Sequence, residues 1–287
     1  MKRLFIITVL LVFSINFAIA QQRPLLTDDV DITPTGAADI GLGVEFTQNE
    51  KFPVSGLKGD LTKFGIVKTR VGLNSNVELQ VEGTLQNYLA INSIGTSAIP
   101  LSTSRISSND TGDFIISTKI KFRNETNSFP AIGLKLGFVL PNSNQSKGIG
   151  VNQINVFGKV LLQKRFGKKP KGDPRANIYG NLGIIILPAP TKLFTQNDLF
   201  LYGLAGIFRI TNRVNLATEI NGRKNTRGGT VPLGTESYSQ FRIGSQIKVS
   251  GLRFDTAAIF GLNKFSPRTG VTFGVTYTTP SLFKPAK

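Results

Sequence analysis

Hydrophobic and polar residues alternate along most of this chain. Residues 77–82 place valine and leucine at odd positions and glutamate and glutamine at even positions, and residues 114–123, 132–140 and 238–249 repeat the pattern. A period of two sends successive side chains to opposite faces of a β-strand, whereas a helix repeats every 3.6 residues. Each of these segments is therefore predicted to be a strand with one apolar face and one polar face.

Twelve such runs begin near residues 40, 61, 77, 113, 131, 153, 177, 199, 214, 238, 252 and 270. Most are about 9 to 13 residues long, close to the ~9–11 that a tilted strand needs to cross a bilayer. Strands of soluble proteins average about five or six residues. We predict an all-β fold, a closed antiparallel transmembrane β-barrel of about 12 strands. A secreted β-sandwich is the alternative, although its strands are generally shorter.

The predicted connections alternate in length. Residues 74–76, 124–130, 211–213 and 250–251 are short, whereas 48–59, 86–112, 141–152, 188–198 and 223–237 are longer and rich in Gly, Ser, Asn and Pro. Outer-membrane barrels have short periplasmic turns and longer outer loops. The connection at residues 164–176 does not fit, because it is long and strongly basic where a short periplasmic turn is expected.

The N-terminus has the layout of a secretory signal. Lys2 and Arg3 precede an apolar run at residues 4–13, and Ala18-Ile19-Ala20 stands before Gln21 as a cleavage site. An uncleaved anchor is the alternative, but the apolar run is shorter than the ~20 residues of a spanning helix. We expect a signal peptide (1–20), an N-terminal periplasmic segment or plug (21–39) and a barrel (40–287) in the bacterial outer membrane.

The chain is strongly basic, with a net charge of +17, or +15 once the two signal cations are removed. A basic protein suggests nucleic acid, but export and the lack of any helix-turn-helix, zinc or RNA-recognition pattern argue against that partner. We expect outer-membrane lipid and lipopolysaccharide, a small-molecule solute and the barrel-assembly machinery as partners. The alternating run at residues 270–279 is the expected recognition strand for that machinery.

Histidine and cysteine are absent. This composition excludes serine-histidine and aspartate-histidine catalysis and the usual zinc ligands. We therefore predict a protein that is not an enzyme and has no catalytic residue, metal or cofactor. Glu78 and Glu82 point the same way on one strand, about 13 Å apart at ~3.3 Å per residue. That spacing is too wide for an acid–base pair, and solvated lumen charges are the better interpretation.

The strand register predicts a basic lumen. The lumen-lining candidates are Glu78, Glu82, Lys119, Lys121, Arg123, Lys135, Lys159, Glu219, Arg242, Lys248 and Arg253, and Glu45, Arg223 and Asp255 face the same way. An excess of cations predicts a pore that prefers anions, and the alternative is a closed lumen of paired charges. Phe157, Leu161, Tyr179 and Ile185 on the inner faces favour a narrow channel for apolar molecules over a wide pore.

A short motif follows the signal. Arg23-Pro24-Leu25-Leu26-Thr27-Asp28-Asp29, with a Gly-rich first strand at residues 41–46, resembles the outer-membrane proteins of the MetA-pathway of phenol degradation family. The resemblance implies a barrel that takes up small, often hydrophobic or aromatic molecules. Separately, Asp28, Asp29 and Asp31 form an acidic patch that we predict to be a small plug against the lumen cations. A mobile periplasmic tail is the alternative.

The expected function is the passage or binding of small solutes through a narrow basic lumen, without catalysis. A non-conducting structural or surface-interaction barrel is the chief alternative, in which the loop at residues 86–112 and basic residues meet lipopolysaccharide or another partner. An exported soluble carrier would follow from the sandwich fold.

Overall fold

The computed structural model describes residues 24–150, 152–167, 174–189 and 196–283, so the predicted signal peptide lies outside the described residues. These ranges hold thirteen strands and one short 3-10 helix at Gln145–Lys147. The strands are β1 (Ala38–Phe52), β2 (Leu57–Gly72), β3 (Val77–Ile94), β4 (Ser107–Asp110), β5 (Phe114–Arg123), β6 (Ala131–Leu140), β7 (Asn155–Phe166), β8 (Ala176–Pro188), β9 (Gln196–Arg209), β10 (Val214–Asn225), β11 (Tyr238–Val249), β12 (Leu252–Gly261) and β13 (Thr269–Thr278). No helix in the described ranges is long and apolar enough to span a membrane.

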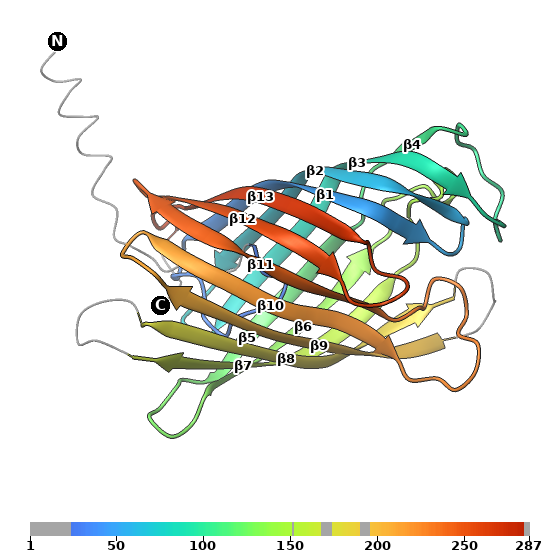
Figure 1. Cartoon of the computed structure of the whole chain (residues 1–287). Helices are drawn as coiled ribbons and strands as arrows, with labels where there is room; N and C mark the ends of the chain where they lie inside the picture. The colour runs from blue at the N-terminus through green and yellow to red at the C-terminus, as the bar shows by residue number, and fades with distance from the viewer. Residues whose placement is uncertain (1–23, 151, 168–173, 190–195, 284–287) are drawn as a thin grey trace, which may run out of the picture.

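Twelve of the strands close into a barrel (Figure 1). Neighbours along the ring pair antiparallel, and β13 pairs with β1 to complete it. The short β4 pairs only with the far part of β3. Closure leaves no open sheet edge in the ring. Open edges would have unpaired backbone groups, which are not tolerated in lipid. The predicted barrel of about 12 strands is confirmed, and each of its strands begins within four residues of its predicted start.

The two ends of the barrel differ. β1 begins and β13 ends at the same end, together with the short turns at residues 73–76, 210–213 and 250–251. Following the usual arrangement of outer-membrane barrels, we call this the periplasmic end, and the end with the longer loops the outer end. β7 ends and β8 begins at the periplasmic end, and residues 168–173 of the basic connection between them fall outside the described ranges.

The first three strands are longer than predicted, and residues 48–59 and 86–94, which we expected in loops, are largely strand. In β1 and β2 the cause is two breaks in the alternation. Asn49 (φ +55°) and Gly65 (φ +66°) both have left-handed backbones, and each lies at a register shift between β1 and β2. A bulge inserts one residue and so exchanges the two faces of the strand beyond it.

The extended ends of β1, β2 and β3 form a small lobe with β4 at the outer end (Figure 1). Leu57, Leu61 and Leu89 are its buried core, and the partly buried residues that pack on this core are Phe52, Ile91, Leu101 and Ile149. The lobe therefore has apolar packing of its own beyond the barrel wall.

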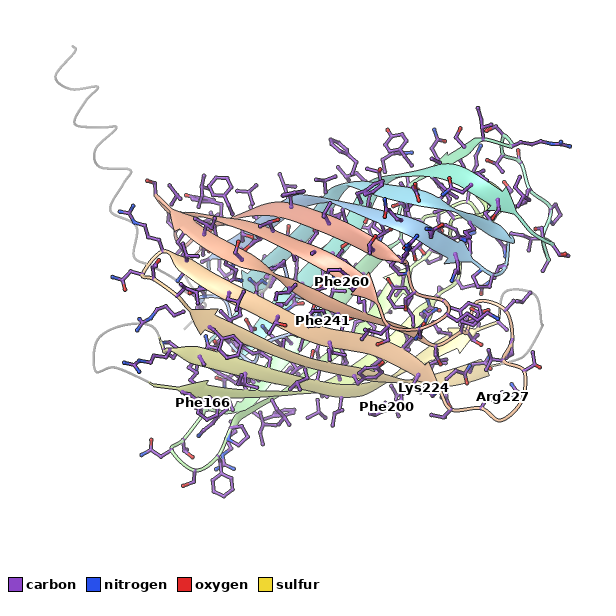
Figure 2. The ribbon with its side chains drawn as sticks, viewed as in Figure 1. Phe166, Phe200, Lys224, Arg227, Phe241 and Phe260 are labelled. Carbon is purple, nitrogen blue, oxygen red and sulfur yellow. The ribbon has the colours of Figure 1, made fainter. Side chains whose placement is uncertain are left out.

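The outer wall of the barrel is apolar. Exposed large apolar side chains on it include Leu136, Leu182, Ile184, Phe200, Leu204, Ile220, Phe254 and Phe273. Phe166, Phe200, Phe241 and Phe260 lie on this surface in Figure 2, and the rings of Phe241 and Phe260 stack at 6.2 Å between centroids. Buried glutamines and charged groups occupy the interior instead. Apolar outside and polar inside is the pattern of a membrane barrel, so the sandwich and the soluble carrier are excluded.

Candidate functional site

The N-terminal segment, residues 24–37, runs through the lumen. Its backbone is bound at successive points by side chains of the barrel wall. Arg242 of β11 donates to the carbonyl of Pro24 (3.4 Å), and Gln163 of β7 accepts from the amide of Val30 (2.8 Å). Gly36 donates to the carbonyl of Gly72 at the end of β2 (2.8 Å). The segment thus crosses the interior from one wall to another before β1 begins.

Two wall side chains bind the middle of the segment. Glu219 of β10 accepts from the amides of Leu26 and Thr27 (2.7 and 2.9 Å) and from the Thr27 hydroxyl (2.8 Å). Asn181 of β8 accepts from the amide of Asp28 (2.7 Å) and donates to its carbonyl (2.8 Å). These bonds satisfy backbone amides and a carbonyl that would otherwise be buried without a hydrogen-bond partner.

Apolar contacts accompany these polar ones. Leu25 belongs to a buried cluster with Tyr179, Ala205, Ile207 and Ala217. Val30 packs against Ala131 and Leu161. Two of the inner apolar residues expected from the sequence, Leu161 and Tyr179, therefore contact the N-terminal segment and do not line an open path.

Asp28 is the centre of a cluster of lysines. Its carboxylate lies 2.6 Å from Lys159, 3.1 Å from Lys135 and 3.8 Å from Lys68. Glu82 shares two of these cations, at 2.9 Å from Lys135 and 3.2 Å from Lys68. Burial would raise the pKa of the Asp28 carboxyl, but the three ammonium groups outweigh burial and hold this pKa well below its usual range.

Asp29 is held by a second group of charges. It lies 2.8 Å from Lys119 and 3.9 Å from Arg70. Lys119 also lies 3.2 Å from Glu78, which accepts from the amide and the hydroxyl of Thr33 (2.6 Å each). Glu78 is fully buried, so our interpretation of it as a solvated charge is wrong. The N-terminal segment covers it, which the strand pattern alone could not reveal.

Asp31 lies nearer the periplasmic end. It pairs with Arg165 of β7 and accepts from the Gln163 amide (2.9 Å). Arg165 is also 3.2 Å from Glu125, in the turn between β5 and β6. All three predicted acidic residues of the segment therefore contact basic side chains of the barrel.

The remaining candidates lie along the other walls. Arg242 pairs with Glu45 (2.8 Å), which also pairs with Lys63 (2.9 Å). Arg253 is buried and pairs with Asp255 (2.9 Å). Lys248 is half-buried opposite Arg253 in the register of β11 and β12.

Arg123 does not line the lumen, contrary to our expectation. It is exposed at the periplasmic rim, with its guanidinium 4.5 Å from the centre of the Phe129 ring. A register shift between Lys121 and Arg123 interrupts the pairing of β5 with β6, so the alternation does not extend to the end of the strand. Lys121, before the shift, is half-buried opposite Gly133.

The sequence-based register missed three cations of the lumen. Lys63 pairs with Glu45, and Lys68 and Arg70 approach Asp28 and Asp29. Lys63 stands at an odd position and the other two at even positions, so a regular strand could not turn all three inward. The bulge at Gly65 makes this possible. A glycine interrupting an alternating run was the available signal.

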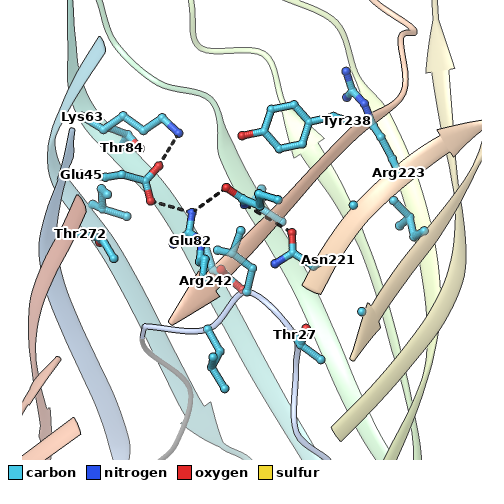
Figure 3. Close-up of a pocket in the computed structure, with 18 of the residues that line it drawn as sticks. Thr27, Glu45, Lys63, Glu82, Thr84, Asn221, Arg223, Tyr238, Arg242 and Thr272 are labelled. Carbon is cyan, nitrogen blue, oxygen red and sulfur yellow. Dashed lines mark hydrogen bonds and ion pairs between the residues drawn. The ribbon is translucent and has the colours of Figure 1, made fainter. Parts of the chain in front are cut away.

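A cavity of about 740 Å³ lies in the lumen towards the outer end (Figure 3). Pro24, Leu25, Leu26 and Thr27 form its floor. Its apolar wall residues include Ile66, Ile115, Ile185 and Leu201, and its charged ones include Glu45, Lys63, Arg223 and Arg242. Ile185 thus faces the cavity as expected, whereas Phe157 is buried beside Lys159 (5.5 Å from ring centre to Nζ).

No family model matches the sequence, and no curated protein matches it. Among solved structures, the chain is similar to an outer membrane channel from Pseudomonas putida F1, with a TM-score of 0.62 and 13% identity over 90% of this chain and 100% of that one. The translocator domain of the autotransporter NalP from Neisseria meningitidis gives a TM-score of 0.46 and 13% identity over 86% of this chain and 90% of that domain. The likeness to the Pseudomonas protein supports the fold of an outer-membrane barrel, and the chain is a protein of the bacterial outer membrane.

Proposed function

We propose that the barrel passes small solutes across the outer membrane and that the N-terminal segment is a plug that restricts this passage. The observation that supports the proposal is the floor of the cavity. Pro24 to Thr27 close its inner side, and the same segment is tied to the walls by the carboxylates of Asp28, Asp29 and Asp31. A solute entering from the outer end meets this segment before it can cross.

The charges of the lumen suggest which solutes pass. The three carboxylates of the segment offset cations that include Lys119, Lys135, Lys159 and Arg165. While the segment is seated, most of these charges are paired and apolar residues share the cavity wall, which suits small and partly apolar molecules. When it leaves, the wall keeps an excess of cations and the path becomes selective for anions.

A catalytic role is not part of the proposal. The chain contains neither histidine nor cysteine, which supply the nucleophile–base pairs and soft metal ligands of most hydrolytic sites. In the described residues, the lumen carboxylates Glu78, Glu82 and Glu45 form ion pairs with Lys119, Lys135 and Arg242. They are structural charges in this proposal.

The family resemblance of the N-terminal motif points the same way. Within the described part of that motif, Pro24 to Thr27 form the cavity floor, and Asp28 and Asp29 meet the lysines. We therefore propose kinship with the MetA-pathway of phenol degradation family and, with it, small hydrophobic or aromatic molecules as solutes.

The second candidate is a non-conducting barrel that interacts with a partner at the cell surface. The lobe at the outer end favours it, since the extended parts of β1 to β3 have a separate core of Leu57, Leu61 and Leu89. A passage for solutes alone would not require strands of this length.

Liposome swelling distinguishes the two candidates. The mature protein is reconstituted and tested with a sugar, an organic acid and a simple aromatic alcohol, beside a variant lacking residues 21–35. Passage predicts slow swelling with the full chain and faster swelling with the deletion, and planar-bilayer currents of the deletion should prefer anions. If neither protein conducts any solute, the surface-interaction candidate replaces the proposal.

A further inference from the structure

Three hydrogen-bond donors meet on one patch of the cavity wall. Asn221 and Arg223 are two residues apart on β10 and so point to the same face, and Tyr238 is directly opposite Arg223 on β11. Directly opposed residues of an antiparallel pair have Cβ atoms about 4.5–5.5 Å apart. All three residues line the cavity, and Figure 3 places Arg223 beside Tyr238.

Within the described part of the chain, each of these side chains keeps at least one donor group without a protein acceptor. Asn221 is 9% exposed, and its Nδ2 has no hydrogen-bond partner among the described residues. Arg223 donates from Nε to the carbonyl of Glu236 (3.1 Å), and its two terminal nitrogens form no ion pair with a described carboxylate. The Tyr238 hydroxyl likewise forms no hydrogen bond with the described residues. Unpaired donors in a confined wall are costly unless a ligand or water satisfies them.

The other cations deeper in the cavity are already engaged. Lys63 and Arg242 share Glu45, and Lys68 and Lys159 share Asp28. Arg223 differs from these four because its guanidinium keeps a face open to the cavity. A guanidinium with two free nitrogens suits the two oxygens of a carboxylate.

Apolar residues adjoin the donor patch. Leu201 of β9 is directly opposite Arg223 on the side away from Tyr238, and Ile185 of β8 lines the cavity beyond it. Pro24, Leu25 and Leu26 provide the apolar part of the floor. A ligand whose charged end meets Arg223 can therefore place an uncharged body against these side chains.

We propose that this patch is a binding site for a small organic carboxylate with an apolar aliphatic or aromatic body. The carboxylate accepts from Arg223, Asn221 and Tyr238, and the body lies along Leu201 and Ile185. The inference names the solute class for the proposed passage and thus rests on that function, although the site can bind even if nothing crosses.

Carboxylates also line the cavity, and those of Glu236 and Glu50 define the competing ligand. Glu236 accepts from the amide of Gly234 (3.1 Å), and Glu50 accepts from the Thr47 hydroxyl (2.9 Å). Both glutamates line the cavity, and their carboxylates could bind an ammonium group, so an amine-bearing ligand is the chemical alternative. The geometry favours the anion because the three unpaired donors are grouped on adjacent strands.

Titration calorimetry of the purified mature protein tests the site with benzoate and hexanoate, with benzamide as the uncharged analogue and benzylamine as the cation. Benzoate and hexanoate should bind, and benzamide should bind at least about 10-fold more weakly. Arg223→Gln should raise the dissociation constant for benzoate about 10-fold to 100-fold, as expected for a bond to a charged group. Tyr238→Phe, which keeps the ring, should raise it less.

Lys224→Gln is the matched control, since the next residue of β10 carries the same charge but is exposed at the outer end (Figure 2). It should bind benzoate as the parent does, and unchanged heat-modifiable migration of the Arg223 and Tyr238 variants should show that they fold. Equal benzoate affinity of parent and Arg223→Gln, tighter binding of benzylamine, or no binding by the parent would each overturn the site. Binding without liposome swelling would refute passage and leave the site intact.

Discussion

Replacing Asp28 by asparagine should release the N-terminal segment. The substitution keeps the size of the side chain and removes the charge that faces Lys159, Lys135 and Lys68 at 2.6, 3.1 and 3.8 Å. Removing one partner of a buried ion pair costs about 3–5 kcal/mol. Two of these lysines keep Glu82, so only Lys159 loses its carboxylate. We therefore expect the lower end, about 3 kcal/mol, or roughly a 100-fold fall in the docking equilibrium constant.

Thiol labelling can measure this equilibrium. The natural chain contains no cysteine, so Val30→Cys would introduce a single thiol at a fully buried position of the segment. Maleimide should modify it slowly in the parent and about 100-fold faster when Asp28→Asn is added, because labelling follows the open population when reclosing is fast. Adding Lys159→Gln to Asp28→Asn should recover part of the loss by removing the unpaired cation.

The control is Asp110→Asn, which removes a carboxylate from β4 at the outer lobe and leaves the lumen unchanged. It should label at the rate of the parent. If Asp28→Asn labels within about threefold of the parent, the lysine cluster does not hold the segment, and the electrostatic account of the plug is refuted.

Three further predictions concern pH and stability. The pKa of Asp28 is lowered in the folded protein. Its contribution to docking of the segment is therefore complete above the unfolded pKa of about 4 and is lost only as pH falls towards the folded pKa. Thiol labelling at Val30→Cys, corrected for thiol ionisation, should thus stay slow from pH 8 to 5 and accelerate in stronger acid. Gly65→Val should cost about 1–3 kcal/mol in urea unfolding, because Gly65 has φ +66° and an added Cβ would lie 2.8 Å from Leu85; an unchanged midpoint would contradict the bulge. Leu204→Arg should destabilise the barrel in lipid vesicles by about 2–4 kcal/mol, since this 62% exposed residue faces outward, and a much smaller loss would mean that this wall does not face the bilayer interior.

Most of the strands were predictable because they have a regular alternation of their own. The alternation of residues 238–249 keeps one register from end to end, and β11 begins and ends where the pattern does. The prediction of a loop at residues 48–59 failed because the bulges at Asn49 and Gly65 exchange the two strand faces. A pattern of period two cannot continue through a bulge. Local sequence thus determines strands well where no residue is inserted.

The site was only partly predictable, because its geometry depends on contacts across the ring. Lys119, Lys135 and Lys159 follow from the alternation, since each is an inward position of a regular strand. The bonds from Glu219 to Leu26 and Thr27 join residues more than 190 positions apart, and no periodicity reports such a pairing. The donor patch at Arg223 depends on the register of β10 against β11 and on the ion pairs that occupy its neighbours.

The path of the N-terminal segment has a consequence for the order of assembly. Pro24 and Leu26 bind Arg242 and Glu219, which lie 218 and 193 residues further along the chain, whereas Thr33 binds Glu78 only 45 residues away. Contacts of such separation form late because a long loop must close first. The beginning of the segment therefore reaches its final place only after β10 and β11 have joined the sheet, and until then Glu219 lacks the amides of Leu26 and Thr27. Docking of the segment therefore indicates that the barrel wall around it is already complete.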